Sequence, residues 1–507
     1  MADASTLIEV LENGEGSHPA VVSPGGPTLT YDGLRRQVGR LMEQLRGFGL
    51  SRTDRVAIVL PNGIEVIASF LAVSGVATAA PLNAAYKPEE FEFYLDDTGA
   101  KAIITGPDAG SEAVEAAAAG TLHITVTMDE SGEMSFSGPP PAGGSENAAA
   151  KGSDVALILH TSGTTSRPKR VPLTHANLTT SLRNVAATYD LGPSDVSLCI
   201  MPLFHVHGLV ASTLATFQSG GTVVVPPKFN PLNFWPVVKE HGVTWYSAVP
   251  SMHQALVSRA KSRGDGDPAA GADSLRFIRS CSAALAPSLM QELEERFGVP
   301  VLEAYGMTEA AHQMASNPLP PADRHPGSVG PGTGVEVAIM DGDGSLLAPG
   351  ERGEIVIKGA NVITGYENNP EANATSFTNG WFRTGDEGVI DDAGYLTLTG
   401  RLKDIINRSG EKISPREIDE VLGDHPAVAE AVAFGVPHAV HGEEPSAVVV
   451  LSGKATAAEL VAYCRTRLAD FKVPRTIHIV DEIPRGATGK IQRRFVAEAF
   501  SGQGPAS

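Results

Sequence analysis

Cysteine is scarce in this chain, which has only Cys199, Cys281 and Cys464 among its 507 residues. Their odd number and wide spacing argue against a disulfide framework, and no two of them have the spacing of metal ligands. So few cysteines fit a reducing compartment. The sequence also lacks a membrane-length apolar run and a charged-then-apolar leader segment. We therefore expect a cytoplasmic protein.

Positive charge is also in short supply. The chain has 58 acidic and 39 basic residues, which gives a formal net charge of -19. Nucleic acids and anionic membranes bind positive surfaces, so this balance disfavours both as partners. Hydrophobic residues make up 42% of the chain, which is ordinary for a globular protein. A chain of this length exceeds one hydrophobic core, and we expect two or more domains.

Short apolar runs alternate with helical patterns through the first 330 residues. A helical period runs from 64 to 79, and strands are expected at 56–60, 101–105, 123–128, 155–159 and 222–225. This alternation is typical of parallel sheets flanked by helices, so the fold class is α/β. The stretch 107–153 is rich in Ala, Gly, Ser and Pro, and parts of it are expected to be surface connections.

The pattern changes after residue 330. Strands are expected at 335–339 and 353–358, separated by a glycine turn at 341–344, and they indicate a small β-rich subdomain. A new unit begins near residue 413, where Ser414 and Pro415 have the pattern of a helix start. We expect domains at 1–402 and 403–507, and the second has an ordinary size for a small domain.

A polar glycine loop follows the strand expected at 155–159. It runs from Thr161 to Lys169 and includes Ser162, Gly163, Thr164 and Thr165. Backbone N–H groups and hydroxyls after a buried strand suit a polyphosphate. The loop is not a Walker A sequence, because Arg170 follows Lys169 where Ser or Thr is required. On composition alone, a Ser/Thr-rich surface turn is the alternative.

Several later segments carry groups that suit a nucleotide. In the segment that begins Glu303-Ala304, Tyr305 could stack on a base, Thr308 could donate to a phosphate and Glu309 could help to hold Mg²⁺. Singly, such residues are more often a packed aromatic, a cap and a solvated acid.

Two more residues suit the ribose diol. Asp386 ends the segment 381–386, and Arg401 lies in 400–404. The ordinary alternatives are a turn residue and a surface ion pair. Lys490, in a glycine-flanked turn within 484–493, is a cation that a mobile element could bring to the chemistry.

Together and in this order, these segments resemble the adenylate-forming superfamily of acyl-CoA synthetases, luciferases and peptide-synthetase adenylation domains. The resemblance extends from about residue 29 to 494. It implies a large AMP-binding domain and a small, mobile α+β C-terminal domain that carries Lys490. It also implies ATP and Mg²⁺ as cofactors and coenzyme A as co-substrate. The family usually has glycine at position 170, so contacts of the phosphate loop could differ here.

The resemblance implies two half-reactions. A carboxylate attacks the α-phosphorus of ATP with Lys490 bridging the reacting groups, and a thiol then displaces AMP. Lys403 matches the hinge position, and Gly410 matches the element that approaches the pantetheine arm in the CoA tunnel. No carrier domain follows Lys490, which favours free CoA over a carrier protein. The oligomeric state is expected to be a monomer or a homodimer.

The acid pocket of the family is formed near residues 204–208, 280–283 and 310–313. Buried polar groups beside an acyl chain cost about 1–3 kcal/mol each, whereas a short diacid would satisfy them. The amino-acid sequence around these segments resembles the oxalate–CoA ligases of plants and fungi. This resemblance implies that His207, Ser282 and His312 hold the second carboxylate, and that His207 could also gate access to CoA. The alternatives are a medium- or long-chain fatty acyl-CoA ligase, an enzyme serving a carrier protein, a luciferase-type monooxygenase, and a binding protein without turnover.

Overall fold

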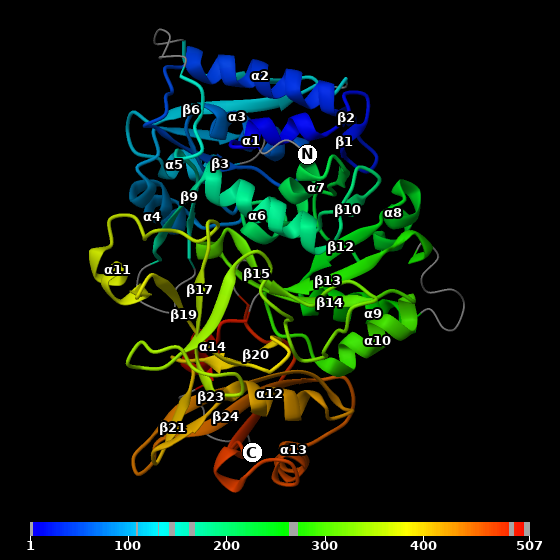
Figure 1. Ribbon diagram of the computed structural model, residues 1–507, viewed down its shortest axis with the longest axis vertical. Helices are drawn as coiled ribbons and strands as arrows, with labels where there is room; N and C mark the ends of the chain where they lie inside the picture. The colour runs from blue at the N-terminus through cyan, green and yellow to red at the C-terminus, as the bar shows by residue number, and fades with distance from the viewer. Residues whose placement is uncertain are drawn as a thin grey trace.

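The chain forms a large N-terminal part and a smaller C-terminal unit, which lie at the two ends of the long axis in Figure 1. The computed structural model describes residues 4–107, 110–129, 131–140, 148–161, 168–262, 272–485 and 491–500. Within these residues, the strands form four sheets. No helix in these ranges is both long and apolar enough to cross a membrane. The three cysteines are free, as expected, and the structure shows that all three are buried.

A seven-stranded sheet begins the N-terminal part. Its order is β7-β6-β5-β3-β4-β8-β9, and its inner pairs are parallel. The outermost strands, β7 and β9, run antiparallel to their neighbours. The strands are β3 (Arg55–Val59), β4 (Thr78–Pro81), β5 (Ala102–Thr105), β6 (Leu122–Met128), β7 (Met134–Ser137), β8 (Val155–His160) and β9 (Arg170–Thr174).

An eight-stranded sheet lies beside it, in the order β15-β14-β13-β12-β10-β11-β1-β2. Only the two edge strands, β2 and β15, are antiparallel to their neighbours. The expected parallel α/β architecture is therefore confirmed. The strands are β1 (Pro19–Val22), β2 (Thr28–Thr30), β10 (Val196–Leu198), β11 (Thr222–Val224), β12 (Trp245–Ala248), β13 (Phe277–Cys281), β14 (Val301–Met307) and β15 (His312–Ser316).

Helices separate and cover these sheets, and α6 contacts strands of both. The longer helices are α2 (Tyr31–Gly47), α3 (Ile64–Val76), α4 (Pro88–Thr98), α6 (His175–Thr188), α8 (Phe234–His241), α9 (Pro250–Ser262) and α10 (Pro287–Phe297). The shorter turns are α1 (Leu7–Val10), η1 (Leu11–Asn13), α5 (Ser111–Ala116), the π-helix η2 (His207–Leu214), α7 (Ala215–Gln218), η3 (Ala272–Ser274) and η4 (Thr308–Ala310).

Helix α3 shows where the helix prediction was wrong. It is buried on nearly every side, as its apolar sequence requires. The apolar run continues past it, but the helix ends at Val76 rather than at residue 79. Ala77 is extended, and the next residues form β4 between β3 and β8. Burial explains the error, since both a buried helix and a central strand are continuously apolar.

The expected β-rich subdomain is confirmed. It is a five-stranded sheet in which all pairs are antiparallel, and the predicted glycine turn lies in the connection between its first two strands. Its elements are β16 (Glu336–Met340), β17 (Arg352–Lys358), α11 (Pro370–Ser376), β18 (Phe377–Thr378), β19 (Trp381–Ile390) and β20 (Leu396–Arg401).

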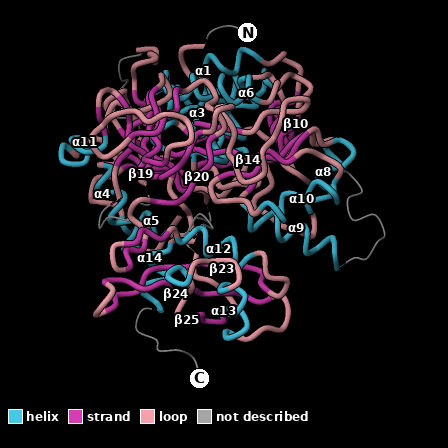
Figure 2. Tube along the Cα trace, turned by 60° about the horizontal axis from the view of Figure 1, so that its bottom comes forward, coloured by secondary structure: helices cyan, strands magenta, loops and turns pink. Residues whose placement is uncertain are grey.

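The C-terminal unit has its own sheet and apolar core, and Figure 2 shows its strands with helices packed beside them. Helix α12 begins at Pro415 as expected, although Ser414 donates its hydroxyl to Thr399 O in β20 instead of capping the helix. The elements are β21 (Ile406–Arg408), β22 (Glu411–Ile413), α12 (Pro415–Gly423), β23 (Val428–His438), β24 (Gly442–Leu451), α13 (Ala457–Arg465), η5 (Asp470–Lys472), β25 (Thr476–Val480) and α14 (Arg493–Phe500).

Candidate active site

Asp386, Arg401 and Tyr305, predicted separately from the sequence, lie together. Asp386 and Arg401 face each other in the antiparallel register of β19 and β20. Arg401 Nε donates to Asp386 Oδ1 at 2.9 Å, and Tyr305 Oη donates to Asp386 Oδ2 at 2.5 Å. Burial raises the pKa of Tyr305 well above its usual value, so its hydroxyl stays a donor. This arrangement fixes a carboxylate and a cation beside an aromatic ring, and their role at a nucleoside stays a prediction.

Tyr366, which the sequence analysis did not identify, contacts both Glu309 and Lys169. The Tyr366 hydroxyl donates to Glu309 Oε1 at 2.7 Å. Lys169 Nζ lies 4.5 Å from the centroid of the Tyr366 ring. Thr308 precedes Glu309 in η4, directly after β14. The end of the phosphate loop and the candidate metal ligand therefore share one aromatic ring.

The residues present fit a magnesium ion. Among the described residues, no group of three or more His, Cys, Asp or Glu forms a metal cage. Mg²⁺ does not need one, because one or two carboxylates together with waters and substrate phosphates usually hold it. Glu309 is buried, and burial raises its pKa. A cation bound beside this carboxylate would favour its ionised form.

Arg170, the departure from the family pattern, forms an ionic cluster at the base of the phosphate loop. Its Nε lies 3.4 Å from Asp97 Oδ2 and 3.6 Å from Glu367 Oε2. His160 Nε2 donates to the same Asp97 oxygen at 2.9 Å, and Arg55 pairs with Glu367. The guanidinium thus ties β9 to α4 and to the segment after β17.

The three residues predicted to hold the acid come from three separate elements and lie together. His207 opens the π-helix η2, Ser282 directly follows β13, and His312 opens β15. His207 Nδ1 lies 3.0 Å from Ser282 Oγ, and the ring centroids of His207 and His312 are 5.3 Å apart. Both histidines are buried. The structure thus brings these three residues together, and their role in holding the acid stays a prediction.

Backbone strain is concentrated around this pocket. Ser282, Ala311 and His312 have φ values of 75°, 50° and 114°, a region that L-residues rarely adopt. Gly306 on β14 explains part of this geometry, because a Cβ there would lie 2.0 Å from His312 O. Such residues cost roughly 1–3 kcal/mol each and persist where the surrounding structure holds them.

Sequence reasoning missed Arg279, which lies in the centre of β13 and is completely buried. Its guanidinium donates to Tyr189 Oη at 2.8 Å, Ser247 Oγ at 2.9 Å and Gln313 Oε1 at 3.1 Å. The available signal was an arginine inside an apolar strand pattern, since charged residues are rarely buried without a purpose.

Some predicted residues remain untested. Lys490 and the loop residues Ser162, Gly163, Thr164 and Thr165 lie outside the described residues. Lys403 is exposed just after β20, and its pKa is lowered by partial desolvation and by nearby Arg401. Gly410 lies in the turn between β21 and β22 with φ 92°, which already requires glycine. The assigned roles of these residues stay predictions.

Comparisons with known proteins agree with this geometry. A family model described as AMP-binding enzyme matches residues 9–367, and one described as AMP-binding enzyme C-terminal domain matches 417–490. The chain belongs to the AMP-binding enzyme family. The oxalate–CoA ligase of Arabidopsis thaliana is 46% identical over 98% of this chain and 99% of its own. That of Saccharomyces cerevisiae is 44% identical over 95% and 94%.

A solved structure extends the likeness to three dimensions. ATP-bound MatB from Rhodopseudomonas palustris has a TM-score of 0.86 at 30% identity, over 98% of this chain and 99% of that one. The protein described here is therefore an AMP-forming acid–CoA ligase of the AMP-binding enzyme family, and it uses ATP, Mg²⁺ and CoA. The comparisons do not favour a fatty acyl-CoA ligase.

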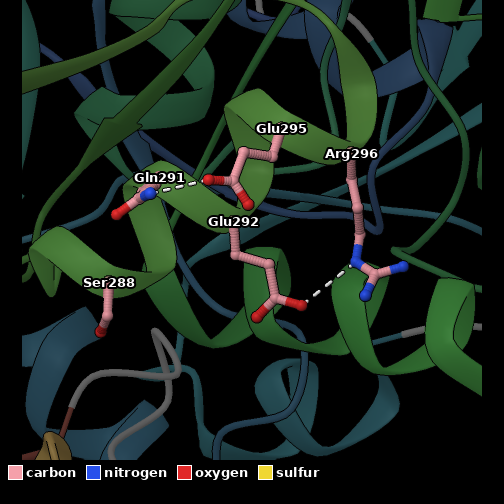
Figure 3. A pocket seen from close by; sticks show the side chains of 5 residues that line it. All are labelled: Ser288, Gln291, Glu292, Glu295 and Arg296. Atoms are coloured by element: carbon pink, nitrogen blue, oxygen red, sulfur yellow. Dashed lines mark hydrogen bonds and ion pairs between the residues drawn. The ribbon is translucent and has the colours of Figure 1, made fainter.

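A separate surface depression of the enzyme lies along α10 and is lined by five residues of that helix (Figure 3). Gln291 donates to Glu295 at 2.7 Å, and Arg296 donates to Glu292 at 3.1 Å. These are pairs one helical turn apart, which stabilise a helix surface modestly. The depression contains none of the residues predicted for nucleotide, metal or acid.

Proposed function

We propose that this enzyme joins oxalate to CoA through an oxalyl-adenylate. The observation that carries the proposal is the convergence of His207, Ser282 and His312 on one pocket. A fatty acyl chain would leave these groups beside methylenes, at about 1–3 kcal/mol for each unsatisfied group. The second carboxylate of oxalate offers the hydrogen-bond acceptor that this polar group of side chains lacks beside an acyl chain. The full-length likeness to two oxalate–CoA ligases supports the same substrate.

The nucleotide side of the proposal assigns each polar group a task. Asp386 and Arg401 hold the ribose, and Tyr305 stacks on the base beside Glu303 and Ala304. The geometry supports this assignment, since the Asp386 carboxylate is held by hydrogen bonds from both Tyr305 and Arg401.

The phosphate side assigns the remaining groups. Thr308 and the loop from Thr161 to Lys169 bind the phosphates, and Glu309 holds Mg²⁺, which offsets phosphate charge when bound. Lys490 reaches the α-phosphate and the attacking carboxylate. One oxalate oxygen then forms a bond to the α-phosphorus while diphosphate leaves.

The second half-reaction needs a rearranged C-terminal unit, because the acyl carbon must become accessible to a thiol. We place the boundary after residue 402 and the hinge at Lys403. Rotation there withdraws Lys490 and brings Gly410 against the pantetheine arm. The CoA thiolate attacks the acyl carbon, and AMP leaves. His207 lies where it can also gate the route between acid and CoA.

Product formation across a series of acids tests the proposal. Diphosphate release and thioester formation are measured with oxalate, malonate, acetate, octanoate and palmitate. Oxalate is expected to have the highest kcat/KM, because it alone satisfies the polar pocket at the right length. If the kcat/KM for octanoate exceeds that for oxalate by about tenfold or more, oxalate is not the substrate.

The His312→Ala variant tests the pocket itself. It should lose oxalate activity while accepting larger monoacids, because it removes a polar partner and opens space. His325→Ala is a matched control, since this half-exposed histidine stacks on Tyr395 at 3.8 Å, outside the pocket. Unchanged oxalate kinetics in His312→Ala would exclude the contact.

We further propose a cytoplasmic enzyme, which its free cysteines suit, and a monomer or homodimer in solution. Fractionation of cells and light scattering of the purified chain test these two points. Recovery with membranes or as a larger assembly would contradict them.

A further inference from the structure

Arg279 is a buried cation whose surroundings are neutral. It lies in β13 with no exposed surface, and no described carboxylate lies within ion-pair distance of its guanidinium. Its partners are instead hydroxyl, amide and imidazole groups. An uncompensated buried charge is costly, so such a residue is expected to serve an anion that arrives from outside.

The guanidinium contacts both histidines of the acid pocket. Nη1 lies 3.5 Å from His207 Nε2, and Nη2 lies 3.4 Å from His312 Nδ1. Arginine has only donors, so these two ring nitrogens face N–H groups and act as acceptors. The proton of each neutral imidazole then belongs on the other nitrogen. Arg279 therefore selects the tautomer of both rings.

Ser247 extends this effect into a chain of hydrogen bonds. Its hydroxyl accepts from Arg279 Nη1 at 2.9 Å and lies 2.6 Å from His207 Nε2, to which it donates. His207 Nδ1 then donates to Ser282 Oγ at 3.0 Å. The direction is fixed because Arg279 can only donate, and because a neutral imidazole that accepts at one nitrogen carries its proton on the other. The first hydrogen bond of this chain, from Arg279 to Ser247, follows from strand pairing, since the two residues are partners in the parallel register of β12 and β13.

We propose that Arg279 is a positioning and specificity residue, whose one-way hydrogen-bond relay through Ser247 and His207 aims the Ser282 proton at the second carboxylate of a small diacid. The buried guanidinium supplies the positive charge that compensates this carboxylate, while both histidines remain neutral donors. The relay ends at the pocket, since Ser282 is partly exposed whereas the other three members are buried. The inference rests on the proposed oxalate activity for its ligand and deepens it.

Two variants separate charge from relay. Arg279→Gln should raise the KM for oxalate about 10- to 100-fold, as expected when hydrogen bonding to a charged group is lost, with kcat and the KM for ATP changed less than about threefold. Ser247→Ala keeps the guanidinium but interrupts the relay, and should raise the oxalate KM about fivefold. A general loss of structure would alter the ATP constants as well. Arg276→Gln is the matched control, because Arg276 pairs with Asp195 at 2.6 Å away from the pocket.

A folded Arg279→Gln enzyme with an unchanged oxalate KM would overturn the proposal. If that variant does not fold, Ser247→Ala decides the matter by the same constant. Partial recovery in Arg279→Lys would support the charge, and a Lys variant as weak as Gln would assign the effect to the relay geometry alone.

A measurement that needs no substrate tests the relay independently of the proposal that oxalate is the substrate. Nitrogen-15 spectra of labelled histidine, assigned with a His207→Gln variant, report which ring nitrogen carries the proton. His207 is expected to carry it on Nδ1 in the wild-type enzyme and to lose this preference in Ser247→Ala. A wild-type proton on Nε2 would overturn the relay even if oxalate is the substrate. A wild-type enzyme that shows the Nδ1 tautomer but does not use oxalate would refute only the substrate.

Discussion

The Tyr366 hydroxyl donates a hydrogen bond to the Glu309 carboxylate across 2.7 Å, inside a buried site. Burial raises the pKa of Glu309, and this hydrogen bond opposes the shift. The ring of the same tyrosine lies under the Lys169 ammonium. One side chain that carries no charge therefore positions an anion and a cation of the proposed ATP site.

Replacing Tyr366 with Phe should move the acid limb of the pH–rate profile upward. The variant keeps the ring beneath Lys169 but removes the donor to Glu309, so the pKa of Glu309 rises further. Activity that needs the ionised carboxylate is lost as pH falls through that pKa, and the loss should begin about one pH unit higher. The measurement is kcat/KM for ATP from pH 5 to 8. Tyr395→Phe, which removes a surface hydroxyl bonded to Asp323 O at 2.6 Å, should leave the profile unchanged.

The sequence was informative wherever a site residue lies at the end of a predicted strand. Ser282 follows β13, and Glu309 lies in η4, which follows β14. Because β13 and β14 are parallel neighbours, the residues that follow them lie at the same edge of the sheet. Asp386 and Arg401 came together because antiparallel strands place them opposite each other. These relations follow from strand order and local pattern.

Other parts of the site depend on packing that no local pattern encodes. Tyr366 lies in a connection far from Glu309 in sequence, and only the tertiary fold brings its hydroxyl there. Arg279 looked like one polar residue within an apolar strand, and its partners come from four other elements. The end of α3 was misplaced for a related reason, because burial on all sides removes the periodicity that distinguishes helix from strand.

Lys490→Ala should separate the two half-reactions. Loss of the amine removes charge stabilisation from adenylate formation, which should slow by on the order of 10²- to 10³-fold. Conversion of preformed oxalyl-adenylate to the thioester should remain, since the lysine has withdrawn by then. Single-turnover assays measure each step, with Lys454→Ala, an exposed lysine of the same unit, as the control. Equal loss of both steps would contradict the assigned role.

Arg170→Gly, which restores the residue usual in the family, should affect stability more than ATP binding. The guanidinium points to Asp97 and Glu367, so its removal leaves two partly buried carboxylates with fewer partners. A loss of ~1–3 kcal/mol in the free energy of unfolding is expected, seen as a lower melting temperature. The KM for ATP should change less than about twofold, whereas Lys169→Ala should raise it. A larger ATP effect than stability effect in Arg170→Gly would place Arg170 at the phosphates instead.

Glu303 should make the folded enzyme less stable as pH rises. This residue is buried on β14, where Leu285 N donates to its Oε1 at 3.1 Å. Desolvation raises its pKa from about 4.5 to about 7. Below pH 4.5 the carboxyl is protonated in both folded and unfolded chains, so the favourable contribution is complete. Between 4.5 and 7 only the unfolded chain releases the proton, and about 3 kcal/mol of folding stability is lost.

Glu303→Gln should therefore gain stability relative to the wild-type enzyme as pH is raised from 5 to 8, because glutamine keeps the acceptor without the titrating proton. The measurement is the difference in melting temperature between the two proteins at each pH, which cancels the contributions of all other groups. Glu336→Gln, in which an exposed carboxylate lies 4.0 Å from Lys358, should show a nearly constant difference. A constant difference for Glu303→Gln as well would mean that Glu303 is already ionised in the folded protein at pH 5. In that case the Arg416 cation of the C-terminal unit, which lowers the pKa of Glu303, would have a larger effect on this pKa than desolvation, which raises it.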